Sequence, residues 1–388
     1  MPATAVTLLL AALLPLPQVA LDPEADERNP PVIPGEGVAV PGLAGVTFDA
    51  LLEVEASRNV SGGIEQSGVL QRKLSLGLSA DLDAAFGWEG ARAYAEGLTA
   101  GGGSLTDRVG DLQIVSEIES DRRDQLSELW FEQRFGELWR VQLGKSDANN
   151  EFARVATGDP FMNSSFGFSP TIFPLPSYPD SAYGAIVEWS PHPQGSVKIG
   201  AYDGATANGS NTGTHSPGVD DDIMYASELA LTWGDGEGSG TGRFAVGAWR
   251  HTADFARWSG GSASHADGAW MVLEQTLWSR DEGESVAAFA QAGWTDDELT
   301  TMGGHLGGGV VWWNALPGHS PGVGFTRVEL TDEPAAGLKY DHETAIETFW
   351  HWQATDRLVL QPTVQGVIHP GGTEDDALVV SARLSWTL

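Results

Sequence analysis

The chain ends in the stretch ALVVSARLSWTL, residues 377–388, and this stretch decides the fold class. One face of the implied strand is entirely apolar and carries Leu378, Val380, Ala382, Leu384, Trp386 and Leu388. The other face is mostly polar and carries Val379, Ser381, Arg383, Ser385 and Thr387. Such alternation predicts a half-buried β-strand. A strand of this kind that reaches the last residue is typical of an outer-membrane β-barrel, where it closes the barrel against the first strand.

The same alternation recurs from residue 46 onward. Segments of about ten residues with alternating polarity follow one another and are separated by turn residues; in the first, Leu52 and Val54 alternate with Glu53 and Glu55. About sixteen such segments are present, an even number that suits a bacterial barrel. A soluble β-sandwich would give the same periodicity. Tryptophans near the strand ends favour the barrel, because they lie where an interfacial aromatic belt is expected: Trp139, Trp350, Trp352 and Trp386.

The connections alternate between short and long. The short turns at 135–137 and 191–195 contrast with the stretches 99–126, 146–181 and 204–223, which predicts tight periplasmic turns and long outer loops. The loop 146–181 mixes polar residues with phenylalanines, so we expect it to fold toward the lumen as a constriction loop. An outer loop packed on itself is the alternative. The polar candidates in this loop are Asp147, Asn150, Glu151 and Asn163, although Asn163 also suits a turn bonded to its own backbone.

The N-terminal part predicts export. The apolar run 5–14 is shorter than the roughly twenty residues that a membrane-spanning helix needs, and it suits a secretory signal peptide over residues 1–20. Its n-region is atypical because no Lys or Arg precedes Arg28, or else translation starts elsewhere. Residues 21–45 are rich in Pro and Gly and predict a periplasmic linker, so the barrel domain is expected to cover residues 46–388.

Composition excludes several classes of function. The 388 residues carry a formal charge of −32, which repels nucleic acid, and the absence of cysteine removes thiol catalysis and Cys-type metal sites. The nine histidines are scattered without metal-ligand spacing, and no hydrolase or nucleotide-binding motif occurs. We therefore expect no catalytic residues, no metal and no cofactor. The acidic charge suits solvated loops, or alternatively a pore or mouth that attracts cations.

Seven blocks in order resemble the OprB-type carbohydrate-selective porins: GDLQIVSEIES (110–120), LSELWFEQRF (126–135), WRVQLGKSDANNEFA (139–153), FMNSSFG (161–167), YPDSAYGAIVEWSP (178–191), ETAIETFWHWQATDRLVLQPTVQGVIHPGG (343–372) and DALVVSARL (376–384). The resemblance extends over residues 46–388. It implies an all-β, transmembrane antiparallel barrel of sixteen strands in the outer membrane of a Gram-negative-type bacterium, with loops that narrow the pore, through which sugars diffuse. Leu388 departs from the family because an aromatic residue commonly ends such chains, and Glu117 stands where Asn is expected.

The polar face of each strand supplies the pore-lining candidates. A sugar that enters a narrow pore loses hydrogen bonds to water, so the wall must replace them with charged and amide groups, and an aromatic ring can stack on the sugar. The segment 126–135 presents the best track, with Glu128, Trp130, Glu132 and Arg134 on one face. The same alternation assigns further candidates to other strands: Lys73, Arg92, Tyr94, Glu96, Arg140, Gln142, Glu347, Gln361, Gln365 and Arg383. For each of them, stabilisation of the wall by ion pairs is the competing interpretation, and a bulge would exchange inward and outward faces.

Three functions remain open on the sequence. The first is a channel for carbohydrates and similar small hydrophilic solutes; the alternatives are an outer-membrane barrel enzyme of protease or lipase type and a non-conducting structural or adhesive barrel. The expected partners are carbohydrate solutes, outer-membrane lipid and the barrel-assembly machinery, with no nucleic acid. We expect a monomer rather than a trimer, as the resemblance implies.

Overall fold

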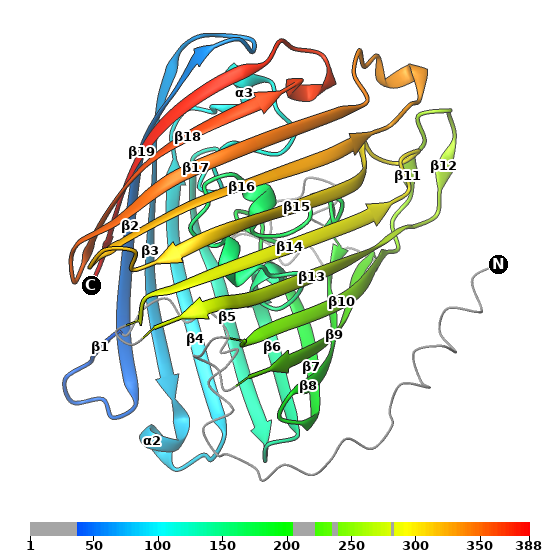
Figure 1. The fold of residues 1–388 in the computed structure, drawn as a ribbon. Helices are drawn as coiled ribbons and strands as arrows, with labels where there is room; N and C mark the ends of the chain where they lie inside the picture. Colours follow the sequence, from blue (N-terminus) through cyan, green and yellow to red (C-terminus); the bar gives the residue numbers. More distant parts are fainter. Residues whose placement is uncertain (1–36, 205–221, 235–239, 281–282) are drawn as a thin grey trace.

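Sixteen antiparallel strands close into one barrel (Figure 1), as the sequence predicts. The computed structural model describes residues 37–204, 222–234, 240–280 and 283–388. The barrel strands are β2 (Val46–Ser61), β3 (Gly68–Asp81), β4 (Ala91–Gly101), β5 (Arg123–Phe135), β6 (Trp139–Ser146), β7 (Ala182–His192), β8 (Gly195–Asp203), β9 (Ile223–Trp233), β10 (Gly242–His251), β13 (Ala266–Ser279), β14 (Ser285–Thr295), β15 (Met302–Trp313), β16 (His319–Leu330), β17 (His342–Thr355), β18 (Leu358–Ile368) and β19 (Ala377–Thr387). Each strand pairs with its neighbours in the sequence.

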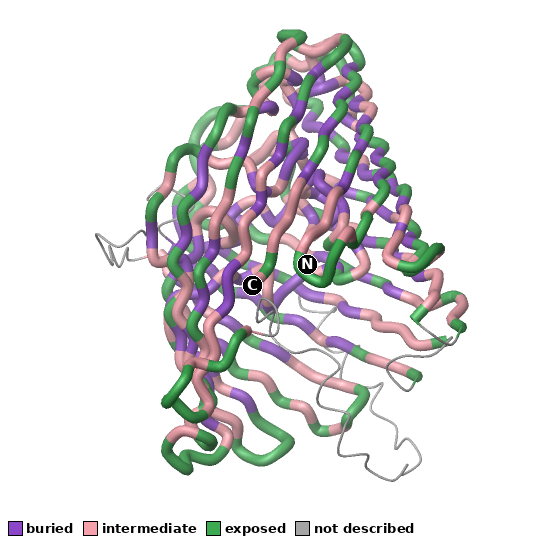
Figure 2. The backbone as a smooth tube through the Cα atoms, turned by 90° about the vertical axis from the view of Figure 1, so that its left-hand side faces the viewer, coloured by how far each residue is buried: buried purple, intermediate pink, exposed green. Residues whose placement is uncertain are grey.

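The terminal strand closes the barrel as predicted. β19 pairs antiparallel with β2, with Ala382 opposite Ala56 and Arg383 opposite Glu55. Leu378 and Val380 are exposed on the outer surface, whereas Val379 and Arg383 are buried on the inner one. Figure 2 shows this alternation of buried and exposed residues along the strands around the barrel. Closure leaves no free sheet edge, which a spanning β-structure requires in lipid.

An aromatic belt surrounds the barrel near the end with short turns. Six tryptophans with exposed rings lie there: Trp88, Trp139, Trp189, Trp312, Trp350 and Trp352. Trp139 stacks on Trp189 with ring centroids 6.1 Å apart. Trp313, the neighbour of Trp312, instead packs against the apolar cluster inside the barrel, as the opposite faces of adjacent strand residues require. Of the four predicted belt residues, Trp139, Trp350 and Trp352 are therefore exposed at this end, and Trp386 is half-buried.

The two ends of the barrel differ in their connections. One end has short turns such as 136–138, 193–194 and 356–357, and a nine-residue connection (82–90) that carries helix α2 (Leu82–Phe86). The C-terminus and the two-residue strand β1 (Val38–Ala39) also lie at this end (Figure 1). β1 pairs with β2, so part of the predicted linker is a strand, whereas residues 1–36, with the predicted signal peptide, lie outside the described residues.

The long connections lie at the opposite end. They carry α3 (Thr106–Val109), the 3-10 turns η3 (Ala148–Asn150), η4 (Ala156–Gly158), η5 (Ser164–Phe166), η8 (Pro334–Ala336) and η9 (Pro370–Gly372), and a small hairpin of β11 (Phe255–Ala256) and β12 (Ser262–Ala263). No helix in the described ranges has the length and apolar character to cross a bilayer.

Two of these connections fold into the barrel. We call residues 102–122 the first inner loop and residues 147–181 the second inner loop. The second inner loop is the predicted constriction loop, and its coil and short helical turns lie inside the ring of strands (Figure 1). Phe161 stacks on Phe166 at 4.2 Å and meets the wall residues Phe289 and Phe349 at 5.8 and 4.9 Å between ring centroids. An apolar core therefore fills the lumen beside β14 and β17.

Candidate functional site inside the barrel

Strand carboxylates hold the backbone of the second inner loop. Three of them accept hydrogen bonds from its N–H groups: Glu228 from Ala153 at 2.9 Å, Glu274 from Thr157 at 2.7 Å and Glu347 from Met162 at 2.7 Å. Two amides donate to its carbonyl groups: Gln291 to Ser165 at 2.7 Å and Gln361 to Pro160 at 2.7 Å. These buried strand residues satisfy loop backbone that would otherwise lie in the lumen without partners.

The first inner loop is held in the same way. Glu343 accepts from the N–H groups of Leu112 and Gln113 at 2.9 and 3.1 Å, and Gln365 donates to the carbonyl of Val115 at 2.8 Å. Glu117, where the resemblance predicts Asn, forms an ion pair with Arg383. Arg383 also donates to Glu55 on the neighbouring strand at 2.7 Å.

Arg140 links the second inner loop to the wall of the barrel. Its guanidinium group donates to Glu188 at 2.8 Å, to Glu132 at 3.1 Å and, with two nitrogens, to Glu151 of the loop. Lys198 donates to the same Glu151 carboxylate at 3.1 Å and to its backbone carbonyl at 2.9 Å. Burial raises the pKa of Glu151, but Lys198 and Arg140 outweigh it and hold that pKa at about 2. Glu151 is therefore charged at any pH at which the protein is folded in a cell.

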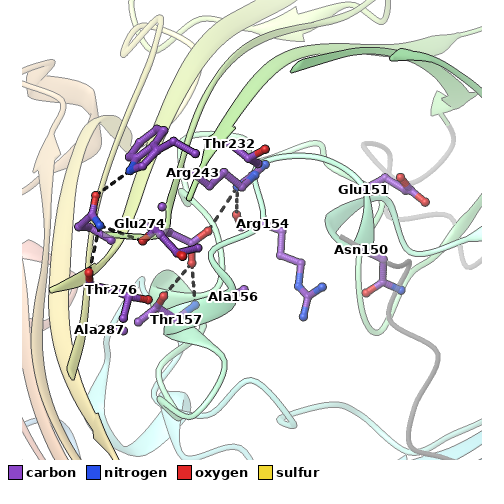
Figure 3. A pocket seen from close by; sticks show the side chains of 14 residues that line it. Asn150, Glu151, Arg154, Ala156, Thr157, Thr232, Arg243, Glu274, Thr276 and Ala287 are labelled. Atoms are coloured by element: carbon purple, nitrogen blue, oxygen red, sulfur yellow. Dashed lines mark hydrogen bonds and ion pairs between the residues drawn. The ribbon is translucent and has the colours of Figure 1, made fainter. Parts of the chain in front are cut away.

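A solvent-open hollow of about 880 Å³ lies under the second inner loop (Figure 3). Its wall includes Arg243, which donates to Glu228 at 2.7 Å and to the carbonyl of Arg154 at 3.0 Å. The side chain of Arg154 extends into the open space in Figure 3 and pairs with Asp159 of the same loop at 2.7 Å. Asn150 and Glu151 line both this hollow and a smaller one beside β5 and β6.

The smaller hollow gathers polar and aromatic groups. Glu128 accepts from the indole N–H of Trp130 at 2.8 Å and from the side-chain amide of Asn150 at 2.9 Å. Trp130 packs on Tyr94 with ring centroids 5.4 Å apart. Asp147 lines the same hollow and accepts from the N–H groups of Asn149 and Tyr178. Burial raises the pKa of Asp147 to about 6, despite these two hydrogen bonds and the nearby Lys73.

Tyr178 and Lys73 lie on the neighbouring part of the wall. The Lys73 ammonium group lies 5.0 Å from the centroid of the Tyr178 ring and pairs with Glu53 at 3.2 Å. The Tyr178 hydroxyl donates to the carbonyl of Ile118 in the first inner loop at 3.0 Å. The two inner loops and β3 therefore meet at this tyrosine.

The candidates named from the sequence fall into three groups in the structure. Those that line the smaller hollow are Glu128, Trp130, Asp147 and Asn150, together with Gln142 and Glu151 of the next group. Tyr94 packs on Trp130, Glu96 is opposite Glu128, and Lys73 faces Asp147. Those within the ion-pair network are Glu132, Arg134, Arg140, Gln142 and Glu151. Those that hold the inner loops or their own backbone are Glu347, Gln361, Gln365, Arg383 and Asn163, whose side chain accepts from Ser165 N–H at 3.0 Å. Arg92 stands apart, exposed on the inner face between Asp81 and Glu132 in the strand register.

The sequence did not lead us to predict five further residues of the site: Tyr178, Arg154, Glu188, Lys198 and Asp49. Lys198 and Glu188 lie on strands in which polar and apolar residues alternate, so this alternation could have assigned both residues to the inner face. Nothing in the sequence indicated that the first inner loop enters the lumen or that Tyr178 lies against Lys73. Within the described residues no cluster of His, Asp and Glu is arranged to hold a metal ion.

Comparisons with known proteins agree with this architecture. Residues 66–388 match the family described as carbohydrate-selective porin, OprB family. Porin B of Pseudomonas aeruginosa is 22% identical over 408 residues, which cover 87% of this chain and 87% of that protein. Putative porin QuiX of Acinetobacter baylyi is 23% identical over 406 residues, covering 88% and 89%. A high-pH structure of Pseudomonas putida OprB has the same fold, with a TM-score of 0.80 and 19% identity over 89% of this chain and 94% of that one.

Proposed function

Because the chain belongs to the carbohydrate-selective porin, OprB family and is an outer-membrane channel for sugars, we propose a route for those sugars along the inner wall of β3–β6. On this proposal the solute passes between that wall and the two inner loops. The channel lies in the outer membrane of a Gram-negative-type bacterium, as its family and its barrel fold indicate.

The observation that carries this route is the unequal filling of the lumen. Beside β14 and β17 the space is closed by Phe161, Phe166, Phe289 and Phe349, each no more than 5% exposed. A hydrated sugar gains nothing by entering such an apolar core. Beside β3–β6 the inner wall carries partly exposed polar groups, and the smaller hollow lies between this wall and the second inner loop. The larger hollow lies beside β9, β10 and β13, on another side of the same loop.

The groups along this route match what a sugar needs. Asn150, Glu128 and Asp147 offer amide and carboxylate atoms to the hydroxyls, and each is partly exposed. Tyr178 is also partly exposed and offers an aromatic face to the sugar ring. Trp130 is only 6% exposed, and its indole N–H donates to Glu128 and so holds that carboxylate in position. We retain Lys73, Glu96 and Arg134 as further contacts. The ion-paired Glu132, Arg140 and Glu151 set the position of the loop.

Block of the ion current by glucose in planar bilayers tests these contacts. Asn150→Ala and Tyr178→Ala should each raise the apparent Kd for glucose about five- to tenfold, because each removes one hydrogen-bonding or stacking group worth about 1 kcal/mol. Asp332→Asn, on the exposed loop between β16 and β17, is the matched control and should leave the Kd unchanged. An unchanged Kd in both alanine variants would place the sugar elsewhere.

The other functions considered make different predictions. A barrel enzyme of protease or lipase type would hydrolyse peptide or phospholipid, and a plugged structural barrel would carry no current. The family and the structural relatives favour a channel over both. We propose that the channel works as a monomer, which the mass of the detergent-solubilised protein tests, and that residues 1–20 are removed on export, which N-terminal sequencing of the mature protein tests.

A further inference from the structure

A row of carboxylates crosses the inner wall from β2 to β5. In the strand register Asp49 is opposite Gly77, Gly77 is opposite Glu96, and Glu96 is opposite Glu128. Gly77 has no side chain, and the Asp49 carboxylate lies across it, since a Cβ there would be 2.3 Å from Asp49 Oδ2. The second inner loop adds Asp147, which lines the same hollow as Glu128. We call Asp49, Glu96, Glu128 and Asp147 the acidic row.

The acidic row differs from the rest of the inner wall. Most other pairs of charged residues that are directly opposite each other on the inner wall have opposite signs: Glu53 with Lys73, Glu55 with Arg383, Glu188 with Arg140 and Lys198, and Glu274 with Arg243. Glu96 and Glu128 are two like charges directly opposite each other, an arrangement that destabilises a sheet. Two cations, Arg134 and Arg140, are also directly opposite each other, but Glu132 forms an ion pair with both of them.

No lysine or arginine of the described residues neutralises the acidic row by an ion pair within 4 Å. Lys73, which faces Asp147, is itself paired with Glu53 at 3.2 Å. Arg92, two residues from Tyr94, lies between Asp81 and Glu132 in the register. The negative charge of the row is therefore left for the lumen.

Neutral donors hold the row in place without cancelling its charge. Glu128 accepts from Trp130 and Asn150, Glu96 accepts from the hydroxyl of Ser127, and Asp147 accepts from two backbone N–H groups. Asp49 is 4% exposed and its Oδ1 has no hydrogen-bond partner. Glu96, Glu128 and Asp147 are each partly exposed, so a solute that brings a positive donor to these carboxylates gains more than a neutral one.

We infer that the acidic row makes this channel selective for cationic sugars, that is, protonated amino sugars, over neutral and anionic sugars. The inference rests on the proposed route, and it specifies the class of solute that the route favours. A sugar acid would meet the same charges as a repulsion.

Current block at pH 7 and low salt tests the inference with three solutes of nearly equal size: glucose, glucosamine and gluconate. In the native channel glucosamine should bind at least about fivefold more tightly than glucose, the Boltzmann factor for one unit charge about 4 Å away in water, and gluconate should bind more weakly than glucose. The ratio should fall toward one in the double variant Glu96→Gln/Glu128→Gln. It should also fall as salt is raised, because salt screens the row.

Two further variants complete the experiment. Asp147→Asn changes only the inner loop and should lower the ratio partway, which keeps the test decisive if the double variant assembles poorly. Asp332→Asn removes the same charge from an exposed outer loop and should leave the ratio unchanged. A native ratio of one or below overturns the inference, and the proposed route survives as long as glucose itself blocks the current. If no sugar blocks the current, the proposed route fails and the inference with it.

Discussion

The connection between Glu151 and Arg140 should be the main attachment of the second inner loop to the polar wall. The substitution Glu151→Gln keeps the shape of the side chain and removes its charge. The pKa of this group is lowered from 4.5 to about 2, which corresponds to roughly 3 kcal/mol of net interaction with Lys198 and Arg140. We therefore expect the substitution to reduce the free energy of unfolding by about 2–3 kcal/mol at pH 7.

The sign of the pH dependence follows from the same shift. A carboxyl group whose pKa is lowered by folding stabilises the protein above its unfolded pKa, and that contribution disappears as pH falls through the folded pKa. The difference between native and Glu151→Gln protein should thus be complete above about pH 4.5 and vanish near pH 2. Urea unfolding of the barrel in lipid vesicles, followed by tryptophan fluorescence, measures it.

Asp159→Asn is the matched control within the same loop. Asp159 pairs with Arg154 at 2.7 Å, but its side chain is 51% exposed, and exposed pairs contribute at most about 1 kcal/mol. If Glu151→Gln costs no more than Asp159→Asn at pH 7, then Arg140 and Lys198 do not hold the loop and the reasoning is refuted.

Three other expectations follow from the structure. Phe161→Ala should lower the free energy of unfolding by about 3–5 kcal/mol, since Phe161 is 2% exposed among three other rings. The same substitution should raise the single-channel conductance. If both quantities are unchanged, this apolar core does not hold the loop. The ratio of K⁺ to Cl⁻ permeability should fall as pH drops through about 6, because Asp147 is charged only above its raised pKa. The groups that face Asp147 are Lys73, Glu96, Glu128 and Tyr202. A permeability ratio that stays constant from pH 7.5 to 5 would contradict this. Leu388→Phe should assemble into the membrane at least as well as the native chain, measured by heat-modifiable mobility on gels, and poorer assembly would mean that the closing strand has been misread.

The strands and their faces could be predicted from the sequence because lipid imposes a strict period of two on one face. The alternation around Leu378 and Val380 correctly placed Arg383 inside, and the segment 126–135 correctly placed Leu129 outside. A bulge lies where Glu96 and Gly97 face Glu128 and Leu126, as a change in register shows. The bulge adds one residue to β5. Glu128 and Trp130 still point to the inner face, as predicted, because both follow the bulge in the sequence.

The roles of the inward residues could not be predicted, because their partners come from loops far away in the sequence. Glu347 and Glu128 look alike along their strands, but Glu347 meets the backbone of Met162, 185 residues away, and Glu128 meets the side chain of Asn150. The alternation of polarity indicates which residues point inward. Only the positions of the inner loops separate those that bind loop backbone from those that remain available to a solute.

The central claim is that sugars pass between Asn150 and the wall of β3–β6. The chain contains no cysteine, so Asn150→Cys supplies a single thiol that a bulky reagent can modify. Glucose flux into proteoliposomes should fall at least tenfold when this thiol is labelled, compared with the same protein before labelling, whereas labelled Asp332→Cys should show no change. Undiminished flux after complete labelling of Asn150→Cys would contradict the account.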